Sequence, residues 1–342
     1  MKPSTRKKST RLRLLRLGTR GSPLARTQSE WVARRLGELQ PGLRVELVII
    51  RTSGDRFSTQ INSGLKPPDP YGGDAALSAK GETARSEDGG PLAAANVKAM
   101  FVKEIESALL KGKVDLAVHS SKDLPADLAP GLCIAAYPER ELPFDVFLGQ
   151  EGAVRWTGLR RGAVIGTASL RRGLQLAQFR PDLRFVPIRG NVHTRVRKMR
   201  AGEADGVILA AAGLRRLGLE DLIQEVLSPE VVVPAPGQGA LAVEAASERT
   251  DILAFLSRLD HGPTRIAVET ERALMHKVGG GCATPLGAFA ALDGDRLFLR
   301  VFGSDPKGLR PLRLSGRSGL SAAERDFMVD DLAGRLLKGI KV

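Results

Sequence analysis

The stretch between residues 155 and 200 holds the side chains best suited to bind a ligand with several negative charges. It contains twelve lysines or arginines and one acid, Asp182. Two motifs in it, residues 166–172 (GTASLRR) and 189–195 (RGNVHTR), each follow a short apolar run typical of a strand and precede helical spacing. Backbone N–H groups and the helix dipole attract anions at such a turn, and arginine forks bind carboxylates through two hydrogen bonds. We therefore expect a polyanion pocket here; the alternative is a basic face exposed to solvent.

A second candidate site lies at residues 119–125 (HSSKDLP), directly after the apolar run 114–118. Open α/β sheets bind ligands at the carboxyl ends of their strands, so these polar side chains should face a cleft. Asp123 stands among many cations, which suits it to stabilise a positive charge or to move a proton. The alternative role for Asp123 is a helix cap before Pro125. His119 is interpreted as a hydrogen-bonded structural residue.

The two cysteines differ in their surroundings and are too few and too far apart for a disulfide framework. Cys282 follows three glycines, which favours a flexible loop with an accessible sulfur, although a small buried residue is the alternative. Cys133 lies in an apolar strand and is expected in the core. A reducing cytoplasm suits both.

Composition limits the class of protein. A chain of 342 residues suggests two or three domains, and 42% hydrophobic with only 4% aromatic residues favours the aliphatic core of an α/β fold. The net charge of +14 implies an acidic partner: a nucleic acid, a membrane surface or a small polyanion. No apolar run approaches the roughly 18 residues of a membrane span. Seven of the first sixteen residues are lysine or arginine, and we interpret residues 1–11 as a disordered basic tail rather than a transit peptide.

Apolar spacing and turn residues locate the expected elements. Strands are predicted at residues 12–17, 43–50, 114–118, 132–137, 163–165, 185–188, 207–211, 231–233 and 239–245. A helix capped by Ser22 should end before residue 41, and another, marked by apolar residues from 101 to 109, should end near Gly112. Residues 144–148 are interpreted as a crossover between domains. A helix at 262–276, three short strands and a final helix from Ser321 complete the chain.

A weak internal repeat organises these elements into domains. A Gly-Thr pair follows a strand at residues 18–19 and again at 166–167, which indicates two lobes of one topology with a cleft between them. The expected fold is α/β, with a small C-terminal α+β domain. Its expected parts are the tail at 1–11, a first lobe of 12–138 and 239–258, a mobile insertion at 56–95, a second lobe of 144–233 and a C-terminal domain of 262–342.

Eight short motifs, specific only when taken together and in order, carry a family resemblance. They are residues 19–25 (TRGSPLA), 101–104 (FVKE), 119–125, 166–172, 189–195, 212–217 (AGLRRL), 236–239 (PGQG) and 280–282 (GGC). Through them the chain resembles the porphobilinogen deaminase family, the hydroxymethylbilane synthases, over nearly its whole length. The resemblance implies two lobes like those of periplasmic binding proteins and a third domain that carries the cofactor.

The same resemblance implies an activity. Such a transferase joins four porphobilinogen molecules head to tail with release of ammonia, in tetrapyrrole and haem biosynthesis. The growing chain is built on a dipyrromethane held by a thioether to a cysteine, here Cys282. Each pyrrole carries an acetate and a propionate, so a basic cleft suits the ligand. We expect a cytoplasmic monomer with no metal, nucleic acid or membrane partner.

The resemblance also assigns roles to residues. Asp123 is the expected catalytic group, because a carboxylate near the pyrrole N–H stabilises the azafulvene cation left when ammonia departs. The expected cofactor-binding residues are Cys282, Lys122, Asp123, Ser169, Arg171, Arg172 and Gly190. The expected substrate-binding residues are Arg20, Ser22, Gln28, Phe101, Thr167, Arg189, Arg195 and Arg216.

Two other classes of protein remain to be weighed. A non-catalytic two-lobed protein that binds an acidic ligand would need neither Asp123 nor Cys282. A nucleic-acid-binding protein is suggested by charge alone, but the chain lacks the aromatic platforms that stack bases. The chain departs from the family pattern in the insertion, in residues 96–99 where a glycine-rich approach is usual, and at Ala168 where serine is common. These departures concern the loop and the rate more than the reaction.

Overall fold

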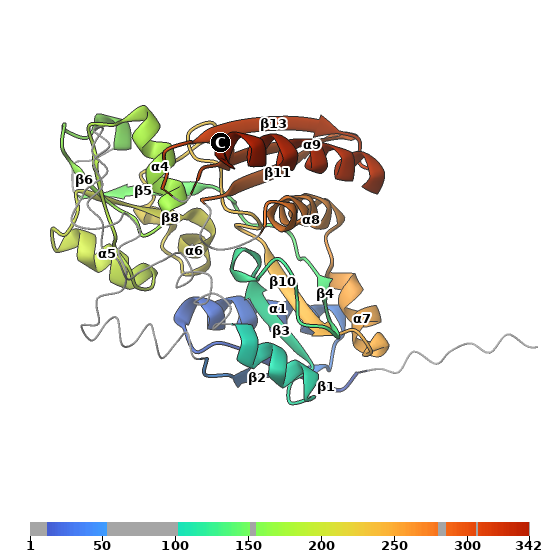
Figure 1. Ribbon diagram of the computed structural model, residues 1–342. Helices are drawn as coiled ribbons and strands as arrows, with labels where there is room; N and C mark the ends of the chain where they lie inside the picture. The colour runs from blue at the N-terminus through green and yellow to red at the C-terminus, as the bar shows by residue number, and fades with distance from the viewer. Residues whose placement is uncertain (1–11, 53–101, 151–154, 280–284, 306, 342) are drawn as a thin grey trace, which may run out of the picture.

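Three β-sheets organise the part of the chain that the structure describes (Figure 1). The computed structural model describes residues 12–52, 102–150, 155–279, 285–305 and 307–341. Two five-stranded sheets, with the orders β2-β1-β3-β10-β4 and β7-β6-β8-β5-β9, form two lobes, and a three-stranded sheet of order β11-β12-β13 forms a third, smaller unit. The predicted fold class, two α/β lobes with a small α+β domain, is confirmed. The predicted basic tail and the insertion at 56–95 lie outside the described residues.

The first lobe is built on a mixed sheet. Strand β1 pairs in parallel with β2 and β3, whereas β10 runs antiparallel between β3 and β4. The strands are β1 (Leu14–Thr19), β2 (Arg44–Ile49), β3 (Leu116–Ser120), β4 (Leu132–Ala136) and β10 (Leu241–Ala246). The strands predicted at 12–17 and 114–118 are therefore displaced by two residues.

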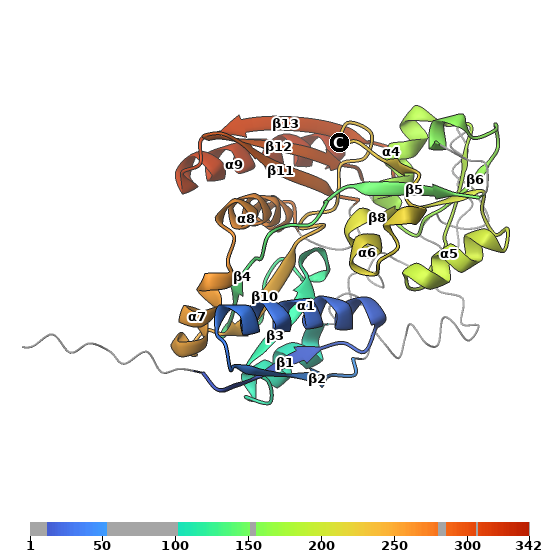
Figure 2. The same cartoon turned by 180° about the vertical axis from the view of Figure 1, so that it is seen from behind.

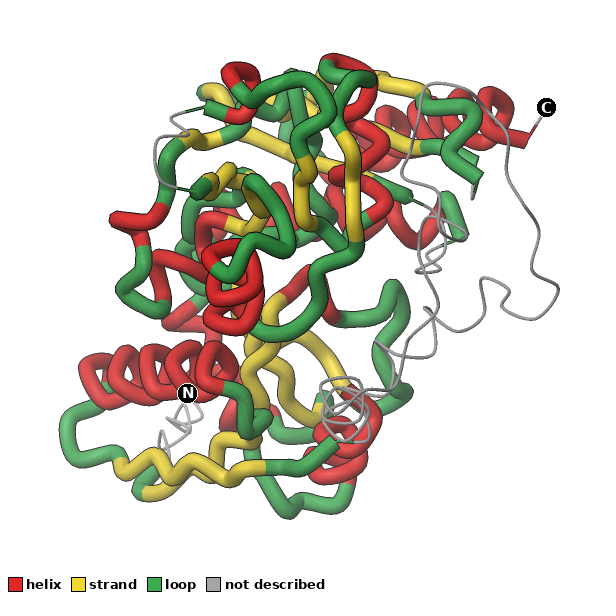
Figure 3. The backbone as a smooth tube through the Cα atoms, turned by 90° about the vertical axis from the view of Figure 1, so that its left-hand side faces the viewer, coloured by secondary structure: helices red, strands yellow, loops and turns green. Residues whose placement is uncertain are grey.

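Helices cover this sheet because their apolar stripes face it. In α1 (Pro23–Leu39) the buried Val32 and Leu36 pack into the core with leucines of β1. Ser22 Oγ accepts a hydrogen bond from Ala25 N at 3.3 Å, so the predicted cap is confirmed. Residues 102–110 form a second helix, and α7 (Thr250–Leu256) follows β10. Helices flank the strands when the molecule is viewed from the side (Figure 3).

The second lobe repeats this plan. Strand β6 pairs in parallel with β7 and β8, and β5 runs antiparallel between β8 and β9. Its strands are β5 (Asp145–Gly149), β6 (Val164–Gly166), β7 (Arg184–Val186), β8 (Gly206–Ala210) and β9 (Glu225–Val226). Its helices are α4 (Leu170–Phe179), α5 (Val192–Arg200) and α6 (Ala211–Arg216). The two Gly-Thr pairs lie at the carboxyl ends of the equivalent strands β1 and β6, so the predicted repeat is confirmed.

Two sequence predictions fail in this lobe. Residues 144–148, interpreted as a crossover, form most of strand β5. Residues 231–233, predicted as a strand, form a turn and irregular chain. Their valines are apolar because Val232 and Val233 are buried in packing clusters. The backbone of Val233 is bonded by side chains instead of a neighbouring strand, since its N–H donates to Gln175 Oε1 at 2.8 Å.

The chain crosses between the lobes twice, from β4 to β5 and from β9 to β10, and the C-terminal unit packs against both crossovers (Figure 2). On the first crossover, the Arg140 guanidinium donates to both oxygens of Glu271 at 2.7 and 3.0 Å. On the second, Ala288 N donates to Pro234 O at 2.9 Å. The C-terminal elements are α8 (Gly262–Lys277), β11 (Gly287–Asp293), β12 (Arg296–Gly303), β13 (Leu312–Ser318) and α9 (Ala322–Lys341). No helix among the described residues is long and apolar enough to cross a membrane.

Candidate active site

The short helix η1 (Ser121–Asp123) follows β3 and places Lys122 and Asp123 where the two lobes meet. The charges of Asp123, Arg171 and Arg172 all act on the Lys122 ammonium. Arg195 of α5 lies within electrostatic reach of Asp123 and Arg172 as well. Motifs that are separate in the sequence, from both lobes, are therefore brought together around Lys122 and Asp123.

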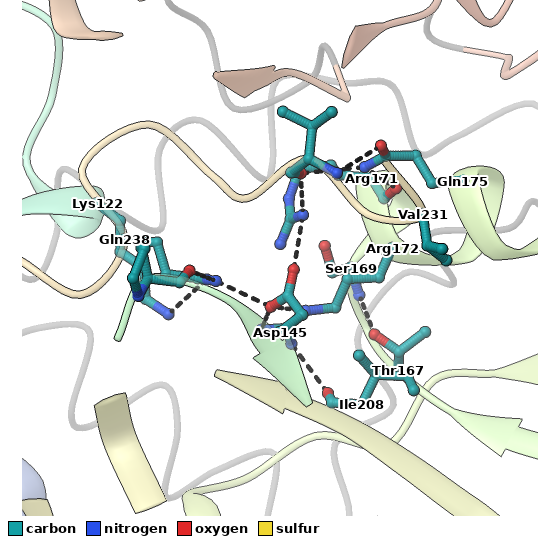
Figure 4. A network of polar contacts seen from close by, with 12 residues as sticks. Lys122, Asp145, Thr167, Ser169, Arg171, Arg172, Gln175, Ile208, Val231 and Gln238 are labelled. Carbon is teal, nitrogen blue, oxygen red and sulfur yellow. Dashed lines mark hydrogen bonds and ion pairs between the residues drawn. The ribbon is translucent and has the colours of Figure 1, made fainter. Parts of the chain in front are cut away.

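Asp145 is the buried centre of the second-lobe half of this site (Figure 4). Its Oδ1 accepts from Arg172 Nε and Nη2 at 2.9 and 2.7 Å, and its Oδ2 lies 2.8 Å from Arg171 Nη1. Burial opposes ionisation, but the two arginines hold the pKa of Asp145 well below its usual range. Two cations against one acid leave the cluster with an excess positive charge.

Arg171 and Arg172 also bind backbone carbonyl groups of the protein. Arg171 Nη1 also donates to Val233 O at 2.5 Å, and Arg172 Nη1 donates to Ile208 O at 3.0 Å. Both side chains are only 6% exposed. The sequence analysis predicts that they bind the ligand. The structure adds that hydrogen bonds and ion pairs within the protein hold both guanidinium groups in place, and we call this positively charged pair the arginine wall.

Lys122 differs from an ordinary surface lysine. It is partly buried, and its Nζ donates to Gln238 Oε1 at 3.3 Å. Burial, together with the nearby Arg172 and Arg171, lowers its pKa to about 8, although Asp123 and Asp145 act in the opposite direction. Its protonation can therefore change close to neutral pH.

Two further arginines, Arg195 and Arg216, are partly buried. Burial, with Arg172 and Arg189 nearby, lowers the pKa of Arg195 to about 10; its Nε donates to Gly190 O at 2.8 Å. Burial also lowers the pKa of Arg216 to about 10, and its Nη2 donates to Gly239 O at 2.6 Å. Cations with reduced hydration gain much from a carboxylate, so the arrangement suits an anionic ligand.

Some predicted contact residues also have structural partners. Gln28 exchanges hydrogen bonds with Ser120 at 3.0 and 3.3 Å, which ties α1 to the end of β3. Thr167 Oγ1 accepts from Ser169 N at 3.2 Å and shapes the turn into α4. The other predicted residues are placed as follows: Ser22 caps α1, Gly190 precedes α5 with a φ of +116°, and Arg20 and Arg189 are partly buried. Cys282 and Phe101 lie outside the described residues.

His119 is a structural residue, as the sequence analysis interprets it. Its Nε2 lies 2.9 Å from Glu244 Oε2 on the adjacent strand β10, and both side chains are buried. Successive residues of a strand face opposite sides of the sheet, so His119 points away from Ser120 and Gln28.

Sequence reasoning missed two residues of this site, Asp145 and Gln238. Asp145 begins an apolar strand, and an acid at such a position is a weak signal of a buried ion pair. Gln238 stands between two glycines in the PGQG motif, which signals a tight backbone rather than a polar contact.

The chain is similar to known proteins over nearly its whole length. A family model for the porphobilinogen deaminase dipyrromethane cofactor binding domain matches residues 15–66 and 76–254, and the model for the C-terminal domain of that enzyme matches residues 265–330. A porphobilinogen deaminase from Syntrophomonas wolfei is 43% identical over 327 residues, covering 96% of each chain. One from Desulfitobacterium hafniense is 42% identical, covering 96% of this chain and 97% of its own.

Solved structures with lower similarity include a periplasmic aliphatic sulphonate binding protein from Escherichia coli. It is 12% identical, has a TM-score of 0.37, and covers 77% of this chain and 70% of its own. The two family models together span most of the sequence, and the relatives match it almost end to end. The chain belongs to the porphobilinogen deaminase family.

Proposed function

We propose that this chain is a hydroxymethylbilane synthase, a transferase of porphyrin and tetrapyrrole biosynthesis that condenses four porphobilinogen molecules head to tail and releases ammonia at each step. The observation that carries the proposal is the position of Asp123 among cations contributed by both lobes. A ligand whose every ring bears two carboxylates matches those cations, and a reaction through a cationic pyrrole matches the acid.

The residues present fit a dipyrromethane primer. Lys122 and Arg195 have lowered pKa values because burial comes with cationic neighbours, and carboxylates of a bound primer would relieve that cost. The bound dipyrromethane supplies the pyrrole ring to which the first substrate is joined. We assign its binding to Lys122, Asp123, Ser169, Arg171, Arg172 and Gly190, and its attachment to Cys282.

Each remaining residue has a role that follows from its chemistry. Asp123 stabilises the cationic pyrrole formed when substrate loses ammonia, and it takes part in moving the proton released as the new bond forms. Arg195 and Arg216 bind substrate carboxylates, since both are desolvated cations. Arg20, Ser22, Gln28, Phe101, Thr167 and Arg189 complete the proposed substrate contacts.

An intact-mass measurement tests this function. We expect the purified wild-type protein to exceed its sequence mass by two pyrrole units, and Cys282→Ser to remove the excess while the protein stays folded. Cys133→Ser is the matched control, because Cys133 lies within β4 and should leave the excess unchanged. A wild-type mass equal to the sequence mass would instead support a binding protein without a primer.

The lowered pKa of Lys122 gives a pH-dependent expectation. A protonated lysine binds a carboxylate and a neutral amine does not, so unloaded protein supplied with porphobilinogen should acquire the primer more slowly as the pH rises through about 8. Lys122→Arg keeps the charge and should remove this dependence, whereas Lys111→Arg on the exposed surface should not. Time-resolved intact mass measures the rate. Identical pH profiles for wild type and Lys122→Arg would show that Lys122 does not bind the primer.

We further propose that the protein acts as a cytoplasmic monomer without nucleic-acid, membrane or metal partners. Its positive charge is directed at the carboxylates of its own substrate, so the net charge of +14 needs no other acidic partner.

A further inference from the structure

We propose that Gln238 is a positioning residue that holds Lys122 away from Asp123, so that the carboxylate stays available to the reacting pyrrole. The inference deepens the proposed function and depends on it. Its basis is a single buried amide that bonds both halves of the site.

The amide of Gln238 is 1% exposed and bonded at both ends (Figure 4). Its Oε1 accepts from Lys122 Nζ at 3.3 Å, and its Nε2 donates to Asp145 Oδ1 at 3.0 Å and to Pro143 O at 2.7 Å. A carboxylate and a carbonyl can only accept, and an ammonium can only donate, so these partners define the orientation of the amide. The side chain therefore connects the first-lobe helix η1 to the second-lobe arginine pair.

The backbone that carries this amide is tightly held. Gly237 has a φ of +70°, and a Cβ at that position would lie 2.6 Å from Ser121 Oγ, so the backbone packs directly on η1. Gly237 N donates to Glu271 Oε2 at 2.6 Å, and Gln238 O accepts from Arg140 Nε at 2.8 Å. Both crossovers and the C-terminal unit thus set the position of Gln238.

The charges explain why a neutral acceptor is needed there. Lys122 and Asp123 are adjacent in the chain and attract each other, because Asp123 favours the charged form of the lysine. A closed Lys122–Asp123 ion pair would cancel the negative charge that a cationic pyrrole requires. Gln238 competes for the ammonium through Oε1 without adding charge, so it keeps the lysine at the primer and the carboxylate available.

A mutant cycle tests this role. Gln238→Met keeps the volume of the side chain but removes the acceptor for Lys122 together with the donor to Asp145 and Pro143 O, so kcat should fall by roughly tenfold to a hundredfold, the range for a lost hydrogen bond to a charged group. KM for porphobilinogen and the primer mass should change little. Because Gln238 is inferred to act through Lys122, adding Gln238→Met to Lys122→Met should cause little further loss. Gln150→Met, whose amide donates to Met199 O and Ala204 O in the second lobe, is the control.

Gln238→Glu separates positioning from folding. It keeps an acceptor beside Lys122, but its second oxygen replaces the donor to Asp145 Oδ1 and Pro143 O. It should therefore lower the melting temperature at least as much as Gln238→Met and yet retain more kcat. The inference would be overturned if both variants lost kcat equally and in step with their melting temperatures. It would also be overturned if the losses of kcat in the double-mutant cycle were additive. A wild-type protein with neither primer mass nor ammonia release would overturn the proposed function instead.

Discussion

Asp123→Asn should bind primer and substrate yet form bilane about a hundred- to a thousand-fold more slowly, the usual cost of losing one preorganised electrostatic partner. The amide keeps the shape and the hydrogen bonding of the acid but not its charge. Asp123 is the acid that acts on both Lys122 and Arg195, so no other group named at this site takes its place there. The measurements are the rate of ammonia release under saturating porphobilinogen and the intact mass.

Two further variants test whether the lost rate comes from the charge of Asp123. Asp123→Glu keeps the charge and displaces it, so it should be faster than Asp123→Asn. Asp127→Asn is the matched control, because Asp127 is highly exposed and pairs with His276 on the protein surface. If Asp123 were merely a cap of the chain before Pro125, asparagine would serve as well. Near-normal turnover in a stable Asp123→Asn protein would therefore move the catalytic role elsewhere.

Asp145→Asn should lower the free energy of unfolding by about 3–5 kcal/mol, the usual cost of removing one partner from a buried ion pair. The carboxylate is fully buried between Arg171 and Arg172, and without it two buried guanidinium groups repel each other with no acid between them. Primer loading should fall too, because the arginine wall depends on the same contact. Chemical denaturation at neutral pH measures the stability change.

The pH dependence of that difference has a definite sign. Burial raises the pKa of Asp145, but Arg171 and Arg172 favour the charged form more strongly and hold the folded-state pKa well below its usual range. Its stabilisation is therefore complete above about pH 4 and is lost as the pH falls through the folded-state pKa. Wild type and Asp145→Asn should differ most near neutrality and converge in strong acid. Asp331→Asn, which breaks an exposed pair with Arg335, should be nearly silent. An Asp145→Asn protein as stable as wild type would mean that the arginines need no acid between them.

The sequence predicts a feature of this protein well where residues close in the sequence determine that feature. The Ser22 cap, the helix that follows it and the position of Asp123 after a strand depend on neighbouring residues, and the structure has all three. The convergence of residues 119–125 with the basic stretch was predictable in outline, because open α/β sheets collect ligands at their carboxyl ends.

Long-range contacts are what the sequence could not predict. The importance of Asp145 depends on arginines twenty-six and twenty-seven positions further along the chain, and that of Gln238 on Lys122, which precedes it by 116 positions. Nothing in the immediate surroundings of either residue requires such a partner. The strand predicted at 231–233 failed for a related reason: side chains of α4, rather than a neighbouring strand, satisfy the backbone of Val233.

The place of β10 in the first sheet has a consequence for how the protein forms during synthesis. Strand β4 has no direct pairing with β3; β10 lies between them and is made only after the whole second lobe. The five strands of the second sheet, by contrast, fall within one continuous stretch, residues 145–226. During synthesis on the ribosome, the second lobe can therefore complete its sheet before β10, a central strand of the first sheet, has been made. The first lobe is thus the later lobe to finish folding, and β3, the strand that leads to Asp123, gains its antiparallel neighbour only when residue 246 has emerged.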